Sequence, residues 1–206
     1  MLYLATASSG ATRNAMRQGR LGLMAQPGNS LGPAMVPGVP WAADNGCFAK
    51  KWDPDKWLAW LERNQPYLDS CLFATVPDKV GNHWATVGRW KKWAPRVRAL
   101  GYPLAFVLQD GVDPSGRGIP WDEIDALFVG GTTEFKLSGL AKMHCIMARE
   151  RGKFVHMGRV NSLKRMKYAM DFCDSVDGTY LAFGPRTNLP KLLRFVNIIN
   201  QLEGTK

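Results

Sequence analysis

The sequence contains no long apolar run. Nowhere do about 18 or more apolar residues follow one another, which is the length that a membrane-spanning helix requires. Met1 leads directly into the residues LYLAT, and this segment has neither the basic region nor the long apolar region of a secretory signal. We therefore expect a cytoplasmic protein that does not contact membranes.

Cysteine is scarce as well. No C-x-x-C pair and no H-x-x-x-H pair occurs, so the sequence gives little support for a zinc site. We expect reduced, buried thiols, no metal and no organic cofactor. The cysteines are too few and too widely spaced for a disulfide scaffold: Cys47, Cys71, Cys145 and Cys173.

Acidic residues are outnumbered by basic ones. The chain has 17 Asp and Glu residues against 27 Lys and Arg residues, which gives a net charge of +10 and a pI near 9.7. A positive surplus favours a polyanionic partner, and nucleic acid is the first candidate. Charge alone does not define a site, so the placement of chemically active residues has to decide the function.

The chain does contain short apolar runs that alternate with helix-like stretches. Its 206 residues suffice for one domain with a large core, spanning residues 1–206. Several runs show no alternation of apolar and polar residues, which is typical of parallel strands buried on both faces. This pattern predicts a compact single-domain (β/α)8 TIM barrel, with an open doubly wound α/β sheet as the alternative. The runs cover residues 2–6, 21–25, 41–43, 72–76, 104–108, 126–129, 154–157 and 175–176.

The stretches between these runs carry helix signals. Residues 53–64 begin with an acidic cap and a proline in the first turn, and residues 83–100 contain Pro95, which we expect to kink the helix. Residues 28–40 are rich in glycine and proline and predict a long loop, whereas residues 203–206 predict a frayed tail. Further helices are expected over residues 137–151, 161–172 and 189–202.

Polar residues follow the apolar runs, and in a barrel the active site forms where the carboxyl ends of the strands meet. Asp44, Asp78 and Asp177 follow three of the runs, and Gln109 ends another. One carboxylate can attack a sugar carbon while a second moves protons, and a further Asp and an amide can read the edge of a purine-like base. Glycine amides, an aromatic ring and a methionine can hold a flat ring. The other residues at strand ends are Gly130, Gly131, Met157 and Gly158.

The motifs at these strand ends resemble those of the tRNA-guanine transglycosylase superfamily, in particular its short phage-encoded relatives that insert 7-deazaguanines into DNA. Residues 44–48 (DNGCF) resemble the superfamily's D-S-G-G-F/Y turn, and residues 128–131 (FVGG) resemble its V-G-G turn. Residues 156–158 (HMG) are similar to its L-M-G strand end, and residues 173–177 (CDSVD) to its V-D-x-F-D strand. The matches occur in the family's order.

The resemblance implies a role for each matching residue. Asp177 would be the nucleophile that forms a covalent glycosyl intermediate, and Asp44 would be a catalytic acid and base. The remaining residues would bind the base by stacking on it, by reading its edge or through backbone amides: Phe48, Asp78, Gln109, Gly130, Gly131, Met157 and Gly158.

The sequence departs from the family after Asp177, where the tRNA enzymes carry a C-x-C-x-x-C…H zinc subdomain that this chain lacks. The implied reaction is therefore the exchange of guanine in DNA for a 7-deazaguanine such as preQ0, in the host cytoplasm if the chain is phage-encoded. A homodimer or an accessory subunit is compatible with the small size. Basic residues after the seventh and eighth runs are expected to bind nucleic-acid phosphates: Arg159, Lys164, Arg165, Lys167 and Arg186.

Other interpretations stay open at this stage. The same chemistry can act on tRNA, a catalytically inactive barrel can bind nucleic acid, and an ordinary glycosidase is a third possibility. Asp44 and Asp177 can form turns, Asp78 can cap a helix, and Met157 can be a core residue. His156 points away from Met157 on a strand, which favours a structural histidine.

Overall fold

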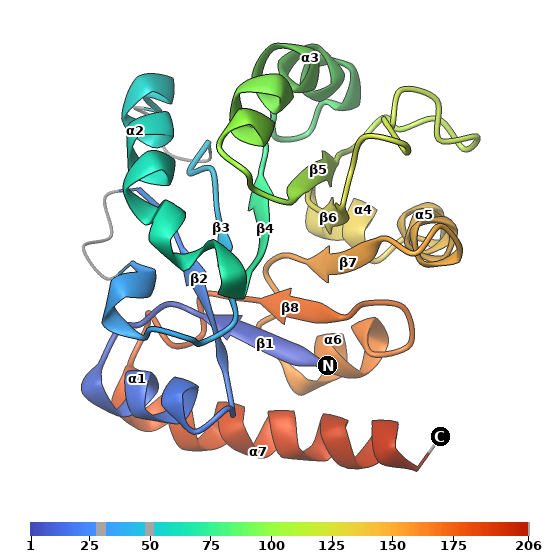
Figure 1. Cartoon of the computed structure of the whole chain (residues 1–206). Helices are drawn as coiled ribbons and strands as arrows, with labels where there is room; N and C mark the ends of the chain where they lie inside the picture. Colours follow the sequence, from blue (N-terminus) through green and yellow to red (C-terminus); the bar gives the residue numbers. More distant parts are fainter. Residues whose placement is uncertain (28–31, 48–51, 206) are drawn as a thin grey trace.

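Eight parallel β-strands close into a barrel in the computed structural model, which describes residues 1–27, 32–47 and 52–205 (Figure 1). Each strand pairs with the next along the chain, and β8 pairs in parallel with β1. This closed order confirms the (β/α)8 TIM barrel and excludes the doubly wound sheet, which has two unpaired edges. The strands are β1 (Leu2–Ala5), β2 (Gly22–Ala25), β3 (Trp41–Ala43), β4 (Cys71–Thr75), β5 (Leu104–Leu108), β6 (Ala126–Val129), β7 (Phe154–Met157) and β8 (Ser175–Asp177).

The helices form a ring around the barrel (Figure 1). Most begin at a polar residue whose side chain accepts a hydrogen bond from a backbone N–H of the first turn, as Asp53 and Asn82 do. Pro95 lies inside a helix that continues through it from His83 to Ala99. The helices are α1 (Gly10–Arg17), α2 (Pro54–Asn64), α3 (His83–Ala99), α4 (Thr133–Lys136), α5 (Gly139–Glu150), α6 (Leu163–Ala169) and α7 (Pro185–Gly204), with 3-10 turns at η1 (Pro33–Met35) and η2 (Gln65–Ser70).

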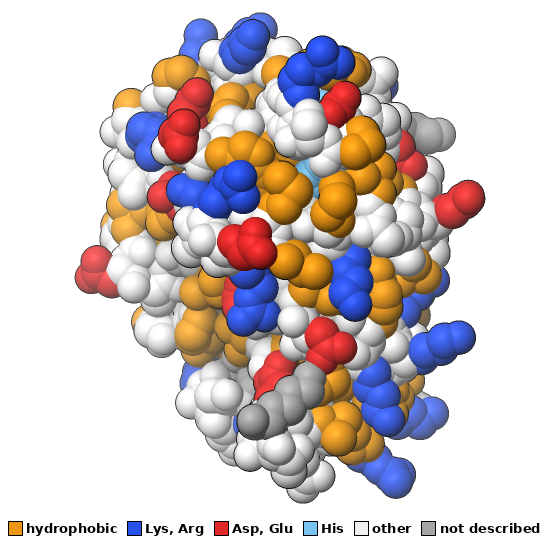
Figure 2. Space-filling model, turned by 90° about the vertical axis from the view of Figure 1, so that its right-hand side faces the viewer, with side chains coloured by type: hydrophobic (Ala, Val, Ile, Leu, Met, Phe, Trp, Pro, Cys, Tyr) orange, Lys and Arg blue, Asp and Glu red, His pale blue; other side chains and the backbone are white. Residues whose placement is uncertain are grey.

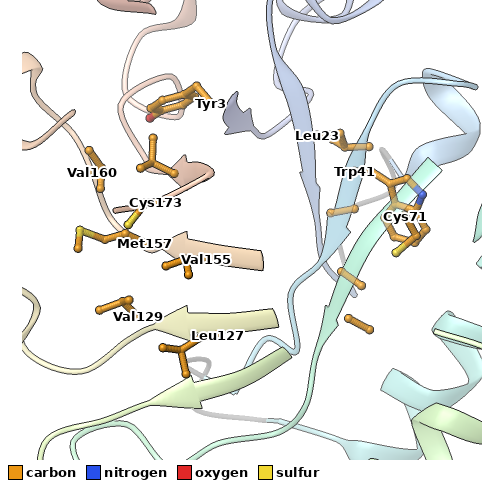
Figure 3. Packing of buried hydrophobic residues seen from close by; sticks show 14 of the residues in the cluster. Tyr3, Leu23, Trp41, Cys71, Leu127, Val129, Val155, Met157, Val160 and Cys173 are labelled. Carbon is orange, nitrogen blue, oxygen red and sulfur yellow. The ribbon is translucent and has the colours of Figure 1, made fainter. Parts of the chain in front are cut away.

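The strands are buried on both faces, which explains their continuous apolar sequence. One face of each strand packs against the helices and forms the larger core, to which Trp41, Leu127 and Val155 belong (Figure 3). The other face fills the barrel. The strands are only three to five residues long, and the buried cluster inside the barrel contains six side chains: Leu4, Met24, Ala42, Phe73, Ala105 and Ala126.

Two peripheral segments contain helical turns. The predicted loop over residues 28–40 contains the turn η1, and residues 28–31 of it lie outside the described residues. The predicted frayed tail is helical up to Gly204, because Glu203 on the last turn of α7 forms an ion pair with the amino group of Met1. No helix within the described ranges is both long enough and apolar enough to cross a membrane.

Candidate active site

A cavity of about 290 Å³ opens at the carboxyl ends of the strands. Each of the eight strands or the loop that follows it contributes to the wall, as Thr6 after β1 and Gln26 after β2 illustrate. Among the residues predicted from the sequence, the cavity is lined by Asp44, Asp78, Gln109, Gly130, Gly131, Gly158, Arg159 and Asp177. The structure therefore brings most of the predicted chemistry into one enclosed space.

Asp78 is the centre of a hydrogen-bond network between the ends of β3, β4 and β5. Its Oδ1 accepts a bond of 2.8 Å from Asn45 Nδ2, and its Oδ2 accepts one of 2.6 Å from Gln109 Nε2. Gln109 Oε1 in turn accepts the N–H of Gly81 at 2.9 Å. Asp78 is buried, and burial raises the pKa of its carboxyl against the effect of the two amide donors. Both carboxylate oxygens are thus fixed by neutral amides.

Asp44 follows β3 and faces the same cavity as the other two aspartates. Burial raises the pKa of its carboxyl to about 7, and the negative charges of Asp177 and Asp78 act in the same direction. The backbone N–H groups of Gly46 and Asn45 oppose this shift. A carboxyl whose pKa lies near 7 can both give and take a proton at neutral pH, which is what a general acid and base requires.

Asp177 ends β8 and is held through a single oxygen. His156 Nε2 lies 3.3 Å from Asp177 Oδ1, and the backbone N–H of Arg159 donates to the same oxygen at 3.0 Å. His156 Nδ1 lies 2.8 Å from the hydroxyl of Ser175, and Phe128 packs on the imidazole with ring centroids 4.6 Å apart. No other described residue hydrogen-bonds the side-chain carboxylate of Asp177. Its second oxygen, Oδ2, is therefore left for a ligand.

His156 and Met157 occupy opposite faces of β7, and the inward one is His156. Met157 is 1% exposed, packs in the outer core near Val160 and Cys173 (Figure 3), and is not part of the cavity wall. The stacking role that the resemblance implied for Met157 is therefore replaced here by a packing role. The other expected stacking residue, Phe48, lies outside the described residues.

Packing around the end of β6 leaves little space for a side chain at either glycine of the pair after this strand. A Cβ atom on Gly130 would lie 2.6 Å from Val107 Cγ1, and the Gly130 N–H already donates to the carbonyl of Leu108 at 3.0 Å. Gly131 has a φ of +77° and lies against Asp110. Its N–H donates to no described residue, so only this amide of the pair is open to a ligand.

Lys136 is a cavity residue for which the sequence analysis predicts no role. It ends α4, is 4% exposed, and donates from Nζ to the carbonyl of Gly158 at 3.1 Å. Burial lowers the pKa of Lys136 to about 8, and the neighbouring charge of Arg159 acts in the same direction. Thr75 is a second such residue, because its buried hydroxyl lines the cavity and has no partner among the described residues. Neither residue belongs to a recognisable motif.

The structure places only some of the predicted phosphate-binding residues at the cavity. Arg159 lines the cavity, whereas Arg165 lies outside the cavity wall and donates from a guanidinium nitrogen to the Arg159 carbonyl at 3.3 Å. Lys164, Lys167 and Arg186 are exposed and lie outside the cavity wall. On the side of the molecule shown in Figure 2, positive and negative side chains are interspersed. Within residues 1–27, 32–47 and 52–205, no group of three or more His, Cys, Asp or Glu residues could hold a metal ion.

No protein-family model and no curated protein matches the sequence. Among solved structures, 3-hexulose-6-phosphate synthase from Salmonella typhimurium is similar, with a TM-score of 0.55 and 16% identity over 96% of this chain and 99% of that chain. Tryptophan synthase from M. tuberculosis is similar with a TM-score of 0.51 and 11% identity over 92% of this chain, which spans 64% of that one. At these identities the likeness shows the barrel fold alone.

Proposed function

We propose that the protein is a DNA-guanine transglycosylase that exchanges guanine for a 7-deazaguanine such as preQ0. The observation that carries the proposal is the presence of three aspartates in three different environments around one cavity. Asp177 keeps one oxygen open, the pKa of Asp44 is about 7, and Asp78 is bound by two amides. A nucleophile, a proton carrier and a recognition group are the three functions that base exchange needs.

In the first half of the reaction, Asp177 Oδ2 attacks C1′ of a nucleotide that has been flipped out of the duplex. The C1′–O bond forms, the C1′–N9 bond breaks, and the bonding pair leaves with guanine. Asp44, protonated below about pH 7, gives its proton to the departing base. The sugar stays covalently bound to Asp177.

In the second half, the ionised Asp44 takes the N9 proton of the incoming 7-deazaguanine. N9 then attacks C1′ and the ester bond to Asp177 breaks, which restores both carboxyl groups to their starting states. Asp78, Gln109 and the Gly131 N–H would hold either base in the plane that this displacement requires. His156 would keep Asp177 oriented by donating from Nε2, with Nδ1 accepting the hydroxyl hydrogen of Ser175.

The test is mass spectrometry of nucleosides from DNA and tRNA of cells supplied with preQ0. The cells would express the wild type, Asp177→Asn, or Asp122→Asn, a control at an exposed aspartate outside the cavity. A deazaguanine deoxynucleoside with the wild type and the control, but not with Asp177→Asn, is the expected result. A modified ribonucleoside would move the substrate to tRNA. Absence of modification from both pools, with nucleic-acid binding retained, would favour an inactive binding barrel.

A further inference from the structure

The cavity contains a buried cation that the exchange chemistry does not use. Lys136 has three N–H donors, and its one hydrogen bond within the described residues goes to the carbonyl of Gly158. No carboxylate oxygen lies within 4.0 Å of its ammonium group in residues 1–27, 32–47 and 52–205. A buried charge without an ion-pair partner is unfavourable, so a ligand in this cavity gains most by presenting an acceptor to Lys136.

The backbone of Gly158 and Arg159 joins this cation to the nucleophile. The Gly158 carbonyl accepts from Lys136, the Arg159 N–H donates to Asp177, and the Arg159 carbonyl accepts from Arg165. Two consecutive residues therefore fix the positions of two cationic groups and one carboxylate. Arg159, a residue of the cavity wall, adds a third positive charge.

Arg159 makes these hydrogen bonds in an unfavourable backbone conformation. Its φ of +62° lies in the left-handed region, and among the described residues other than glycine it is the one with a positive φ. A side chain in that region costs roughly 1–2 kcal/mol. Glycine would avoid this strain but would remove the positive charge of a residue that lines the cavity. The surrounding hydrogen bonds hold the residue there in spite of the strain.

We propose that Lys136, together with Arg159, forms an oxyanion subsite that binds the phosphate adjoining the sugar attacked by Asp177. Arg165 supports this subsite from outside the cavity wall, through its hydrogen bond to the Arg159 carbonyl. Two carboxylates, those of Asp177 and Asp110, lie on this side of the cavity, and Asp110 is already bound by the N–H and the hydroxyl of Thr132. The positive charges of Lys136, Arg159 and Arg165 outnumber them, and a phosphate oxygen accepts strong hydrogen bonds from both ammonium and guanidinium donors. The identification of the sugar rests on the proposed function. The binding of phosphate does not, because it can be measured without any exchange.

The experiment compares the binding of deoxyguanosine 5′-monophosphate, deoxyguanosine and inorganic phosphate by calorimetry. The variants are Lys136→Met, Lys136→Arg and Lys142→Met, the last at an exposed lysine of α5 outside the cavity wall. The wild type and Lys142→Met are expected to bind the nucleotide about tenfold more tightly than the nucleoside, which corresponds to one charge-assisted hydrogen bond. Lys136→Met is expected to lose this preference, and Lys136→Arg to recover part of it.

Two results would contradict the proposed phosphate subsite. One is equal affinity of the wild type for nucleotide and nucleoside; the other is an unchanged preference in a folded Lys136→Met. A variant that loses affinity for free preQ0 but keeps the phosphate preference would also refute it, because Lys136 would then contact the base. Loss of the preference in Lys136→Met without base exchange by the wild type would uphold the subsite and reject the transglycosylase.

Discussion

The two sides of the cavity are built in different ways. On the side of β3 to β5, the carboxylate of Asp78 is enclosed by the amides of Asn45 and Gln109. On the side of β6 to β8, Asp177 Oδ2 and two of the three N–H donors of Lys136 have no hydrogen-bond partner among the described residues. Both side chains are held by the backbone of residues 158 and 159. The first side is suited to recognising a neutral edge, and the second to charge and bond exchange.

Asp44 lies where the two sides meet, because the charges of Asp177 and Asp78 both act on its carboxyl. Asp44→Asn should have a larger effect than a change on either side alone, lowering the exchange rate by about 10²- to 10⁴-fold through loss of the proton carrier. Single-turnover kinetics would measure it. A variant with more than a tenth of the wild-type rate would show that protons move by another route.

The same variant has a second, pH-dependent signature. In the unfolded chain the carboxyl of Asp44 has a pKa of 3.8, whereas in the folded chain the pKa is about 7. Between these values the folded state holds the extra proton, so the contribution of Asp44 to stability falls as the pH rises through this range and then levels off. Asn should therefore stabilise the protein at pH 8, by on the order of 2 kcal/mol, and leave it unchanged at pH 3. Denaturation in urea at both pH values checks this sign.

A substitution at Asp78 tests the role of the side of the cavity formed by β3 to β5. In Asp78→Asn an amide group must face the N–H donors of both Asn45 and Gln109, and it can accept from them with only one oxygen. We expect a loss of about 1–3 kcal/mol of stability and weaker binding of the free base, while binding of inorganic phosphate is unchanged. Asp122→Asn serves as the control. Phosphate binding that falls in parallel would mean that the two sides are not independent.

A substitution at Arg159 tests the role of the side of the cavity formed by β6 to β8. Arg159→Gly relieves the left-handed strain, which stabilises by roughly 1–2 kcal/mol, but glycine loses about 0.5–1 kcal/mol in backbone entropy. These two backbone terms nearly offset each other, so a shift of the thermal midpoint reports on the contacts of the Arg159 side chain. The preference for nucleotide over nucleoside should decline. A lowered midpoint would indicate that the guanidinium group itself stabilises the fold.

The smallest effect is expected outside both sides, at Met157. Met157→Leu conserves volume in the outer core and should change stability by less than about 1.5 kcal/mol. Exchange should stay within about twofold of the wild type, because the side chain does not reach the cavity. A large rise in the KM for the free base, without loss of stability, would restore a stacking role to this methionine.

Much of the fold was predictable because buried parallel strands have an unmistakable apolar sequence. The residues of β3, β5, β6 and β7 coincide with the runs predicted for them. The sequence analysis did not predict helix α1, because its sequence GATRNAMR is short and contains only one large apolar residue, Met16. Its stability comes from the Ser9 cap and the packing of Ala15 and Met16.

The site was predictable in its acidic residues and much less so in its other polar groups. The end of a strand can be read from the sequence, so Asp44, Asp78 and Asp177 were identified by position. Which of two neighbouring residues faces inward depends on where the strand enters the barrel, and a shift of one residue exchanges the two faces. This is why His156, and not Met157, was found at the nucleophile. Lys136 could not be found in this way because it enters the cavity from the end of a four-residue helix.

The short strands also have a consequence for how the protein can change. Leu4 and Met24 belong both to the cluster that fills the barrel and to the wall of the cavity. These side chains therefore contact the ligand and also form part of the core of the barrel. A larger ligand could be accommodated only by trimming side chains whose removal from a core costs about 2–5 kcal/mol. The size of the accepted molecule and the thermodynamic stability of the barrel are thus linked, so neither can evolve freely without the other.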